Sequence, residues 1–130
     1  MQGFHAALMG VRLAKTERPC SGVSERIHYE MSVFLRTAEF DAWLKALRDP
    51  IGKARILARL RAAELDHFGD HASVGDAVFE LRIHTRPGYR VYYWRQGSVT
   101  YWLLCGGDKS TQRRDIQQAK ALRTQLETER

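Results

Sequence analysis

The sequence predicts an α+β domain in which an N-terminal helical hairpin packs on a small antiparallel β-sheet and a C-terminal helix follows. Three features predict this class: apolar residues with helical spacing between 37 and 66, three strand-like segments between 77 and 105 of which the first alternates strictly, and a basic helical segment near the C-terminus. The chain has 130 residues, which is enough for one domain but too short for two ordinary ones. The expected element order is β-α-α-β-β-β-α.

Residues 1–30 differ from the rest of the chain. They show no sustained hydrophobic period, and the stretch TERPCSGVSER within them is polar and turn-like. We therefore expect residues 1–30 to be a flexible or extra N-terminal extension and residues 31–130 to form the domain. The alternative is an additional element that docks on the core.

The segment 31–36 (MSVFLR) has the composition of a short strand, and two helices are expected after it. Thr37 can cap the first helix, whose apolar residues recur at i, i+3, i+4 and i+7: Phe40, Trp43, Leu44 and Leu47. The Asp49-Pro50 pair ends that helix, because the residue before a proline is disfavoured in the helical conformation. A second helix is expected from about Ile51 to Asp66, and so short a break between the two predicts an antiparallel hairpin.

The second half of the domain predicts three strands and a final helix. A glycine-containing loop is expected at 68–77, followed by strands at 77–84, 89–95 and 98–105. The third strand is apolar on both faces, as is typical of a central strand, and Gly106-Gly107 is expected to end it. The last helix is expected from about Thr111 to Glu127.

One face of the predicted sheet carries an unusual set of side chains. Alternation directs Phe79, Leu81 and Ile83 toward the helices and leaves the other face at least partly open. The residues expected on that open face are Glu80, Arg82, His84, Arg90, Tyr92 and Trp94. Arginine forks bind phosphate in a bidentate manner and aromatic rings stack on unpaired bases, so this set suits RNA. The alternative is that the aromatic residues reflect only β-propensity.

A second basic group lies in the stretch GGDKSTQRRDI. Lys109, Arg113 and Arg114 stand near the start of the last helix, where cations are electrostatically unfavourable. Their position indicates that an anion binds there, although a charged surface helix is the alternative. The formal net charge of +6 and the pI near 9.7 likewise favour an anionic partner.

Cysteine usage and hydropathy predict a cytoplasmic protein without a membrane partner. Cys20 and Cys105 lie far apart and match no metal-binding spacing, and Cys105 sits in an apolar run where a free thiol behaves as a small hydrophobic group. No run approaches the roughly 18 apolar residues that a membrane span needs, and the first residues lack the pattern of a signal peptide.

No metal or cofactor is expected. His67 and His71 are four residues apart, but a Gly-Asp pair between them breaks any helix that would align them as ligands. No phosphate-binding loop, dinucleotide-binding motif or nucleophile elbow is present in the sequence. The candidate acid–base residues near the basic cluster are Glu80, His84 and Asp108.

Three segments together carry a resemblance to a known family: 40–60 (FDAWLKALRDPIGKARILARL), 80–98 (ELRIHTRPGYRVYYWRQGS) and 103–122 (LLCGGDKSTQRRDIQQAKAL). They resemble the RelE/ParE superfamily of toxins from type II toxin–antitoxin modules, and most closely the HigB-like addiction-module killer proteins. The resemblance implies a RelE-like fold over about residues 31–130. It also implies an mRNA endoribonuclease that acts on the ribosome without a metal and is neutralised by a cognate helix-turn-helix antitoxin.

By this resemblance Arg82, Arg90 and Lys109 hold the scissile phosphate. The predicted open face and the basic stretch add four RNA-binding candidates: Tyr92, Trp94, Arg113 and Arg114. Several family members carry a tyrosine or histidine near the final loop, but this chain reads DKSTQRRDI there. Asp108 or Asp115 could take the acid–base role instead. Two alternatives stay open: a toxin that inhibits DNA gyrase without cleaving RNA, and a degenerate toxin that only binds its antitoxin.

Overall fold

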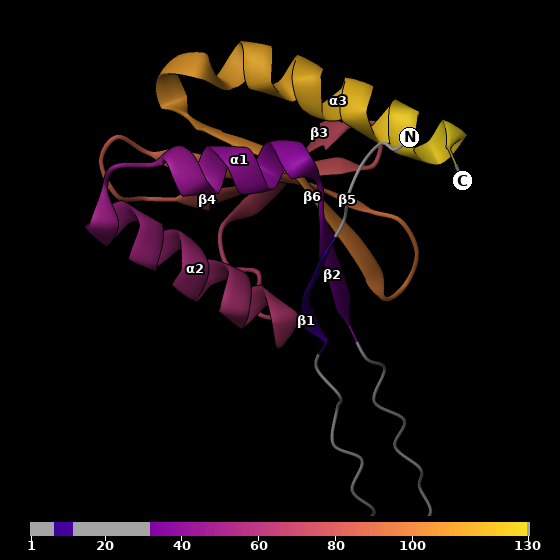
Figure 1. Cartoon of the computed structure of the whole chain (residues 1–130), viewed down its shortest axis with the longest axis horizontal. Coiled ribbons are helices and arrows are strands. Elements are labelled where there is room, and N and C mark those ends of the chain that lie inside the picture. Colours follow the sequence, from indigo (N-terminus) through magenta and orange to yellow (C-terminus); the bar gives the residue numbers. More distant parts are fainter. Residues whose placement is uncertain (1–6, 12–31, 130) are drawn as a thin grey trace, which may run out of the picture.

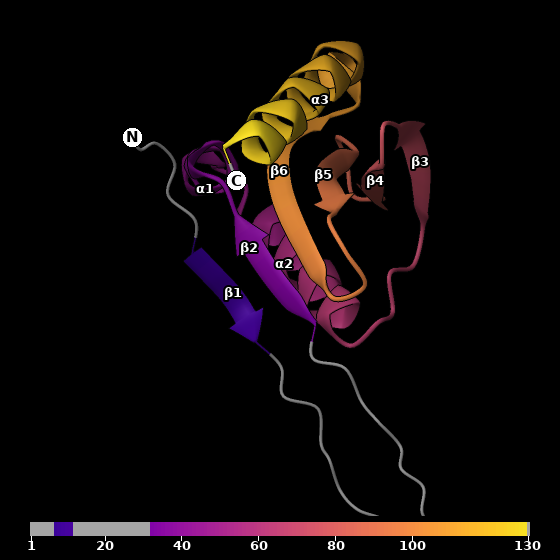
Figure 2. The same ribbon diagram turned by 90° about the vertical axis from the view of Figure 1, so that its right-hand side faces the viewer.

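A six-stranded sheet with helices on both faces forms the body of the molecule in this computed structural model, which describes residues 7–11 and 32–129 (Figures 1 and 2). Its strands are β1 (Ala7–Val11), β2 (Val33–Arg36), β3 (His71–Gly75), β4 (Val78–Ile83), β5 (Tyr89–Arg95) and β6 (Thr100–Asp108). Its helices are α1 (Ala38–Ala46), α2 (Pro50–Glu64), the short 3-10 turn η1 (Lys109–Thr111) and α3 (Gln112–Thr128). The predicted α+β class and C-terminal helix are confirmed.

The sheet is mixed rather than antiparallel, with the order β1-β2-β6-β5-β4-β3. β2 runs parallel to β6, and every other neighbouring pair is antiparallel. The expectation of a purely antiparallel sheet is therefore wrong. The chain between β2 and β6 passes through α1, α2, β3, β4 and β5, and a connection of this length allows a parallel pairing. The two helices thus follow strands in the chain instead of opening it.

Local capping explains where the first two helices begin. The Thr37 hydroxyl oxygen accepts a hydrogen bond from Phe40 N at 3.0 Å, and the hydroxyl donates to Leu104 O at 2.7 Å. Asp49 caps α2 by accepting from Gly52 N at 3.0 Å, and Pro50 occupies the first turn, where its missing N–H costs nothing. The predicted cap at Thr37 is confirmed.

Two apolar clusters lie on opposite faces of the sheet. The first joins α1 and α2 to the sheet through buried residues that include Phe40, Leu44, Ile56, Leu60, Leu81, Val91 and Leu103. The second joins α3 to the other face through buried residues that include Val78, Tyr92, Trp94, Trp102, Leu104, Ala119, Leu122 and Leu126. The sheet therefore has no broad open face, which corrects the expectation from sequence.

Three segments differ from the sequence-based assignment. Residues 71–75, expected to be loop, form β3 and pair with β4. β6 continues through both glycines to Asp108 instead of ending before them. Ala7–Val11, inside the expected N-terminal extension, pair with β2, while residues 1–6 and 12–31 of that extension lie outside the described part of the chain.

Gly107 permits the close approach of α3 to β6, and we expect Gly107→Ala to lower the free energy of unfolding by about 1–3 kcal/mol. A Cβ at this position would overlap the carboxylate of Asp115 and lie 2.9 Å from Thr111 Oγ1. Urea denaturation measures the effect. Gly97→Ala is the matched control because a Cβ there meets no atom within 4 Å. Equal unfolding midpoints for the two variants would contradict the prediction.

Candidate functional site

Arg82 on β4 and Arg90 on β5 stand directly opposite each other in the strand register. Both reach the same carboxylate: Arg82 Nε lies 2.9 Å from Glu80 Oε2, and Arg90 forms an ion pair with that oxygen at 3.6 Å. The two arginines therefore share one face of the sheet, as the alternation predicts. Their accessibility differs, since the Arg82 side chain is 36% exposed and that of Arg90 is 14% exposed.

Glu80 is the anchor of this pair. Its side chain is only 2% exposed, and its second oxygen, Oε1, accepts a hydrogen bond from Gln112 Nε2 of α3 at 3.0 Å. A carboxylate with both oxygens engaged in this way orients the guanidinium groups and is shielded from substrate. The hydrogen bond to Glu80 is the main cause that raises the pKa of Arg82 above its ordinary value.

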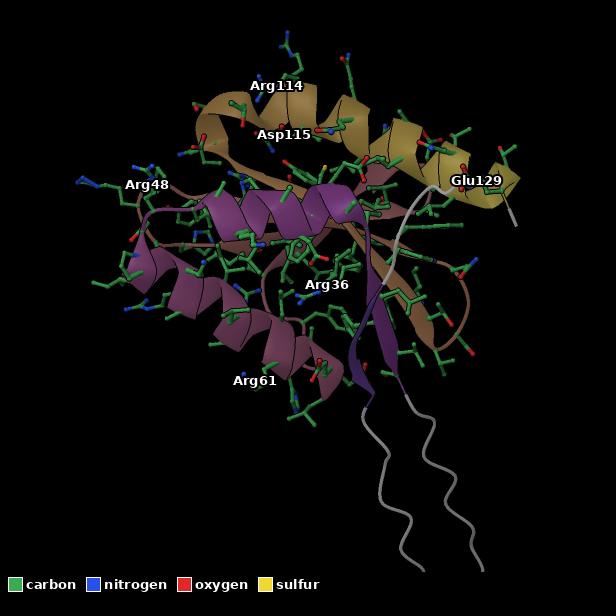
Figure 3. The ribbon with its side chains drawn as sticks, viewed as in Figure 1. Arg36, Arg48, Arg61, Arg114, Asp115 and Glu129 are labelled. Carbon is green, nitrogen blue, oxygen red and sulfur yellow. The ribbon has the colours of Figure 1, made fainter. Side chains whose placement is uncertain are left out.

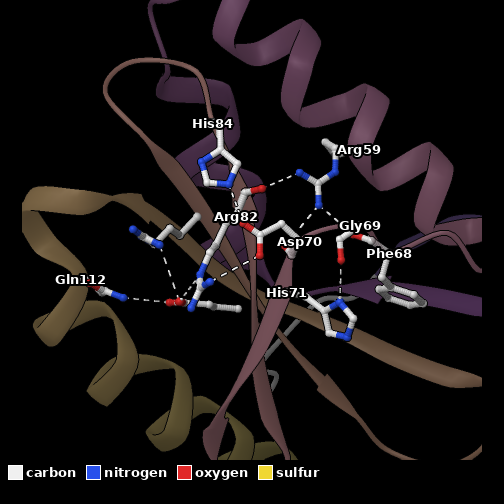
Figure 4. A network of polar contacts seen from close by, with 10 residues as sticks. Arg59, Phe68, Gly69, Asp70, His71, Arg82, His84 and Gln112 are labelled. Carbon is white, nitrogen blue, oxygen red and sulfur yellow. Dashed lines mark hydrogen bonds and ion pairs between the residues drawn. The ribbon is translucent and has the colours of Figure 1, made fainter.

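A second carboxylate, Asp70, lies on the exposed side of Arg82 (Figure 4). Arg82 Nη1 approaches Asp70 Oδ1 at 3.4 Å, and His84 Nε2 lies 2.5 Å from Asp70 Oδ2. The hydrogen bond from His84 is the largest cause that lowers the pKa of Asp70. Asp70 thus links the imidazole and one guanidinium through its two oxygens.

Arg59 of α2 holds the backbone of this region, and the sequence analysis missed it. Its guanidinium donates to the carbonyl oxygens of Arg82, Phe68 at 2.7 Å and Asp70 at 3.3 Å. These contacts tie α2 to β4 and to the segment that carries Asp70. In the sequence Arg59 resembles the other solvated basic residues of α2. The one sequence signal for its contacts with backbone carbonyls is its position beside the apolar stripe of that helix.

Tyr92 and Trp94 do not face solvent, contrary to expectation. Both are buried under α3 and belong to the apolar cluster on that side of the sheet. The hydroxyl of Tyr92 has no hydrogen-bond partner among the described residues, and burial raises its pKa. Neither ring can stack on a base while α3 remains in place.

Asp108 caps η1, and Asp115 in the first turn of α3 binds a side chain of the same turn. Asp108 Oδ1 accepts from Ser110 N at 2.8 Å, and the buried carboxylate of Asp115 accepts from Thr111 Oγ1 at 2.5 Å. Both carboxylates therefore stabilise the turn that carries the basic residues.

Lys109 and Arg113 are exposed on either side of Gln112, the residue that contacts Glu80. Together with Ser110, Gln112 and Ile116 they line a shallow pocket. The Lys109 side chain also crosses the β4–β5 turn, because a Cβ on Gly88 would lie 3.5 Å from its Cδ. Arg114 is 75% exposed and lines a neighbouring pocket with Arg113.

The charges of this site partly cancel. The carboxylates of Glu80 and Asp70 offset Arg82 and Arg90, and Asp115 pairs with Arg114 at 3.7 Å, so the surplus positive charge comes from Lys109 and Arg113. The arrangement can hold an anion between a guanidinium fixed by carboxylates and exposed cations at the rim. Gln112, which the sequence analysis did not select, joins the rim to Glu80.

Other features of the described residues add little to this site. No three or more His, Cys, Asp or Glu side chains within them gather closely enough to hold a metal ion, and none of their helices is both long and apolar enough to cross a membrane. Cys105 is buried, which raises its pKa to about 12.

No protein-family model matches the chain, and no solved structure matches it either. An uncharacterized protein of Haemophilus influenzae is 51% identical to it over 90 residues, which cover 69% of this chain and 91% of that protein. Identity at this level over nearly the whole of the relative indicates common descent. The chain therefore belongs to the same protein family as this uncharacterized Haemophilus influenzae protein.

Proposed function

We propose that the protein is the toxin of a type II toxin–antitoxin module with a RelE-like fold, and that it cleaves mRNA on the ribosome. The observation that carries the proposal is the pair Arg82 and Arg90, opposite each other on one face and joined through Glu80 to Gln112, which lines a pocket with the exposed Lys109 and Arg113. Guanidinium groups held by a buried carboxylate, together with exposed cations, suit a phosphodiester whose negative charge grows during reaction.

The proposed reaction needs neither metal nor cofactor. The RNA 2′-hydroxyl attacks the adjacent phosphorus, the bond from phosphorus to the 5′-oxygen breaks, and the products are a 2′,3′-cyclic phosphate and a free 5′-hydroxyl. Arg82 binds the non-bridging oxygens, and Lys109 adds charge from the loop. Arg90, which is largely enclosed, positions Glu80 and Arg82.

The proposed partners are the ribosome with its mRNA and a helix-turn-helix antitoxin. An acidic segment of the antitoxin laid over Lys109 and Arg113 would block RNA and stabilise the toxin by binding only its folded form. The affinity of such a complex is expected to fall as salt rises.

The test is induction of the protein in cells, followed by primer extension on mRNA. We expect the double variant Lys109→Ala/Arg113→Ala to cleave about 10²-fold less than wild type, because transition-state charge is left unbalanced. The matched control is Arg55→Ala/Arg61→Ala, which removes the same amount of positive charge from exposed positions of α2. Figure 3 shows that Arg61 on α2 is well separated from Arg114 at the start of α3.

Equal cleavage by both double variants would refute the assignment of the site. Growth arrest with intact mRNA would instead point to a toxin that does not cleave RNA, and a gyrase supercoiling assay with purified protein would then test the gyrase alternative.

A second candidate, an antitoxin-binding module without nuclease activity, is favoured by one observation. The two residues expected in place of the family's tyrosine or histidine are engaged in local hydrogen bonds: Asp108 caps η1, and Asp115 accepts from Thr111. This candidate predicts unimpaired growth after induction together with an intact antitoxin complex, measured by co-purification.

A further inference from the structure

Four side chains near the strand arginines could exchange a proton with RNA: Glu80, His84, Asp108 and Asp115. Three are committed to other contacts. Glu80 is enclosed between two arginines and Gln112, and Asp115 is buried against Thr111. Asp108 accepts from both the backbone N–H and the hydroxyl of Ser110, at 2.8 and 2.6 Å.

His84 is the exception, because it is both oriented and accessible. Its side chain is 72% exposed, and Nε2 donates to Asp70 Oδ2 at 2.5 Å. The other ring nitrogen, Nδ1, makes no hydrogen bond within the part of the chain that the structure describes. An imidazole held at one nitrogen by a carboxylate and open at the other is the arrangement of a positioned acid or base.

The imidazole also lies beside the phosphate-binding group. Arg82 and His84 contact the two oxygens of the same Asp70 carboxylate, so the guanidinium and the imidazole lie on either side of it (Figure 4). A phosphate bound by Arg82 on the solvent side would bring an ester oxygen toward His84. The Asp70 carboxylate fixes the ring through Nε2, so Nδ1 is the nitrogen from which a proton can pass to that oxygen.

We propose that His84, oriented by Asp70, is the general acid that protonates the leaving 5′-oxygen of the RNA. The proposal rests on the nuclease function proposed above and deepens it by naming the proton donor. As the bond from O2′ to phosphorus forms, the proton of the 2′-hydroxyl passes to solvent water. As the bond from phosphorus to O5′ breaks, the proton on His84 Nδ1 passes to O5′, and solvent then reprotonates the ring.

The test compares two mRNAs on programmed ribosomes in single-turnover reactions. One carries an ordinary A-site phosphodiester, and the other carries sulfur in place of the bridging 5′-oxygen, a leaving group that needs no protonation. We expect His84→Ala to be about 10²–10³-fold slower than wild type on the oxygen substrate. On the sulfur substrate its rate should approach that of wild type.

Three further variants separate catalysis from folding. His84→Gln keeps a donor for Asp70 but has no proton to release, so it should share the defect of His84→Ala. Asp70→Asn should be slowed less, because the imidazole is retained without its anionic support. His67→Ala, which changes another exposed histidine, should match wild type on both substrates.

Each outcome decides a different point. If His84→Ala is slowed equally on both substrates, His84 has a structural role and the acid assignment is overturned. If His84→Ala cleaves both substrates at the wild-type rate, the acid assignment is also overturned, but the proposed nuclease function stands. A wild-type protein that cleaves neither substrate would overturn the proposed function and this inference together.

Discussion

Replacing Glu80 with alanine is expected to lower the free energy of unfolding by about 3 kcal/mol, measured by urea denaturation. The carboxylate is 2% exposed and pairs with Arg82 at 2.9 Å and Arg90 at 3.6 Å. Its loss leaves the guanidinium of Arg90, which is only 14% exposed, without its carboxylate partner. This loss of unfolding free energy lies near the lower end of the usual range for breaking a buried ion pair. The reason is that Arg82 still pairs with Asp70 and is partly exposed to solvent in the variant.

The matched control is Glu127→Ala. Glu127 pairs with Arg123 at 3.1 Å on the surface of α3, four residues along the helix, so its removal should cost only about 0.3–0.5 kcal/mol. Glu80→Gln should lie between the two, since an amide oxygen can accept one of the hydrogen bonds but carries no charge. A loss below about 1 kcal/mol for Glu80→Ala would show that water replaces the carboxylate readily.

The alternation of the strands predicted half of this site correctly. Period two placed Arg82 and Arg90 on one face and Leu81 and Val91 on the other, and the observed register and core agree. Because strand alternation is a property of the local backbone, it can be recognised in the sequence without knowing the rest of the fold.

The prediction of an open face failed although the sequence held a signal against it. β6 is apolar on both sides, which requires cover on both faces. The last helix also carries an apolar stripe at helical spacing, formed by Ile116, Ala119, Leu122 and Leu126. Taken together, the two features predict that α3 covers Tyr92 and Trp94. The many basic residues of α3 make its apolar stripe harder to recognise.

The remaining differences depend on contacts between distant segments. Alternation puts Glu80 on the polar side, but only the approach of Gln112 and α3 makes that side enclosed. β3 is short and polar because it is an edge strand, so composition alone does not separate it from a loop. The parallel pairing of β2 with β6 joins segments more than 60 residues apart, and no local pattern encodes it.

The second large effect is expected at Arg82. Arg82→Ala should slow RNA cleavage on the ribosome by about 10²–10³-fold, because the more exposed guanidinium is the one that can reach a phosphate. Arg90→Ala should act differently, since the enclosed Arg90 supports Glu80: we expect a larger loss of unfolding free energy and a smaller loss of RNA affinity. Single-turnover rates, filter binding to RNA and urea denaturation, measured on the same preparations, separate the two roles.

Lysine substitutions keep the test meaningful if an alanine variant folds poorly. Arg82→Lys retains the charge and an ion pair with Glu80 or Asp70, but it lacks the planar fork that binds two phosphate oxygens at once. We therefore expect Arg82→Lys to fold, to bind RNA, and to cleave at least about tenfold more slowly, since one bidentate contact is lost. A well-folded Arg82→Lys protein that cleaves at the wild-type rate would show that Arg82 contributes only its charge. An Arg82→Ala protein that cleaves at the wild-type rate would show that Arg82 does not take part in the reaction.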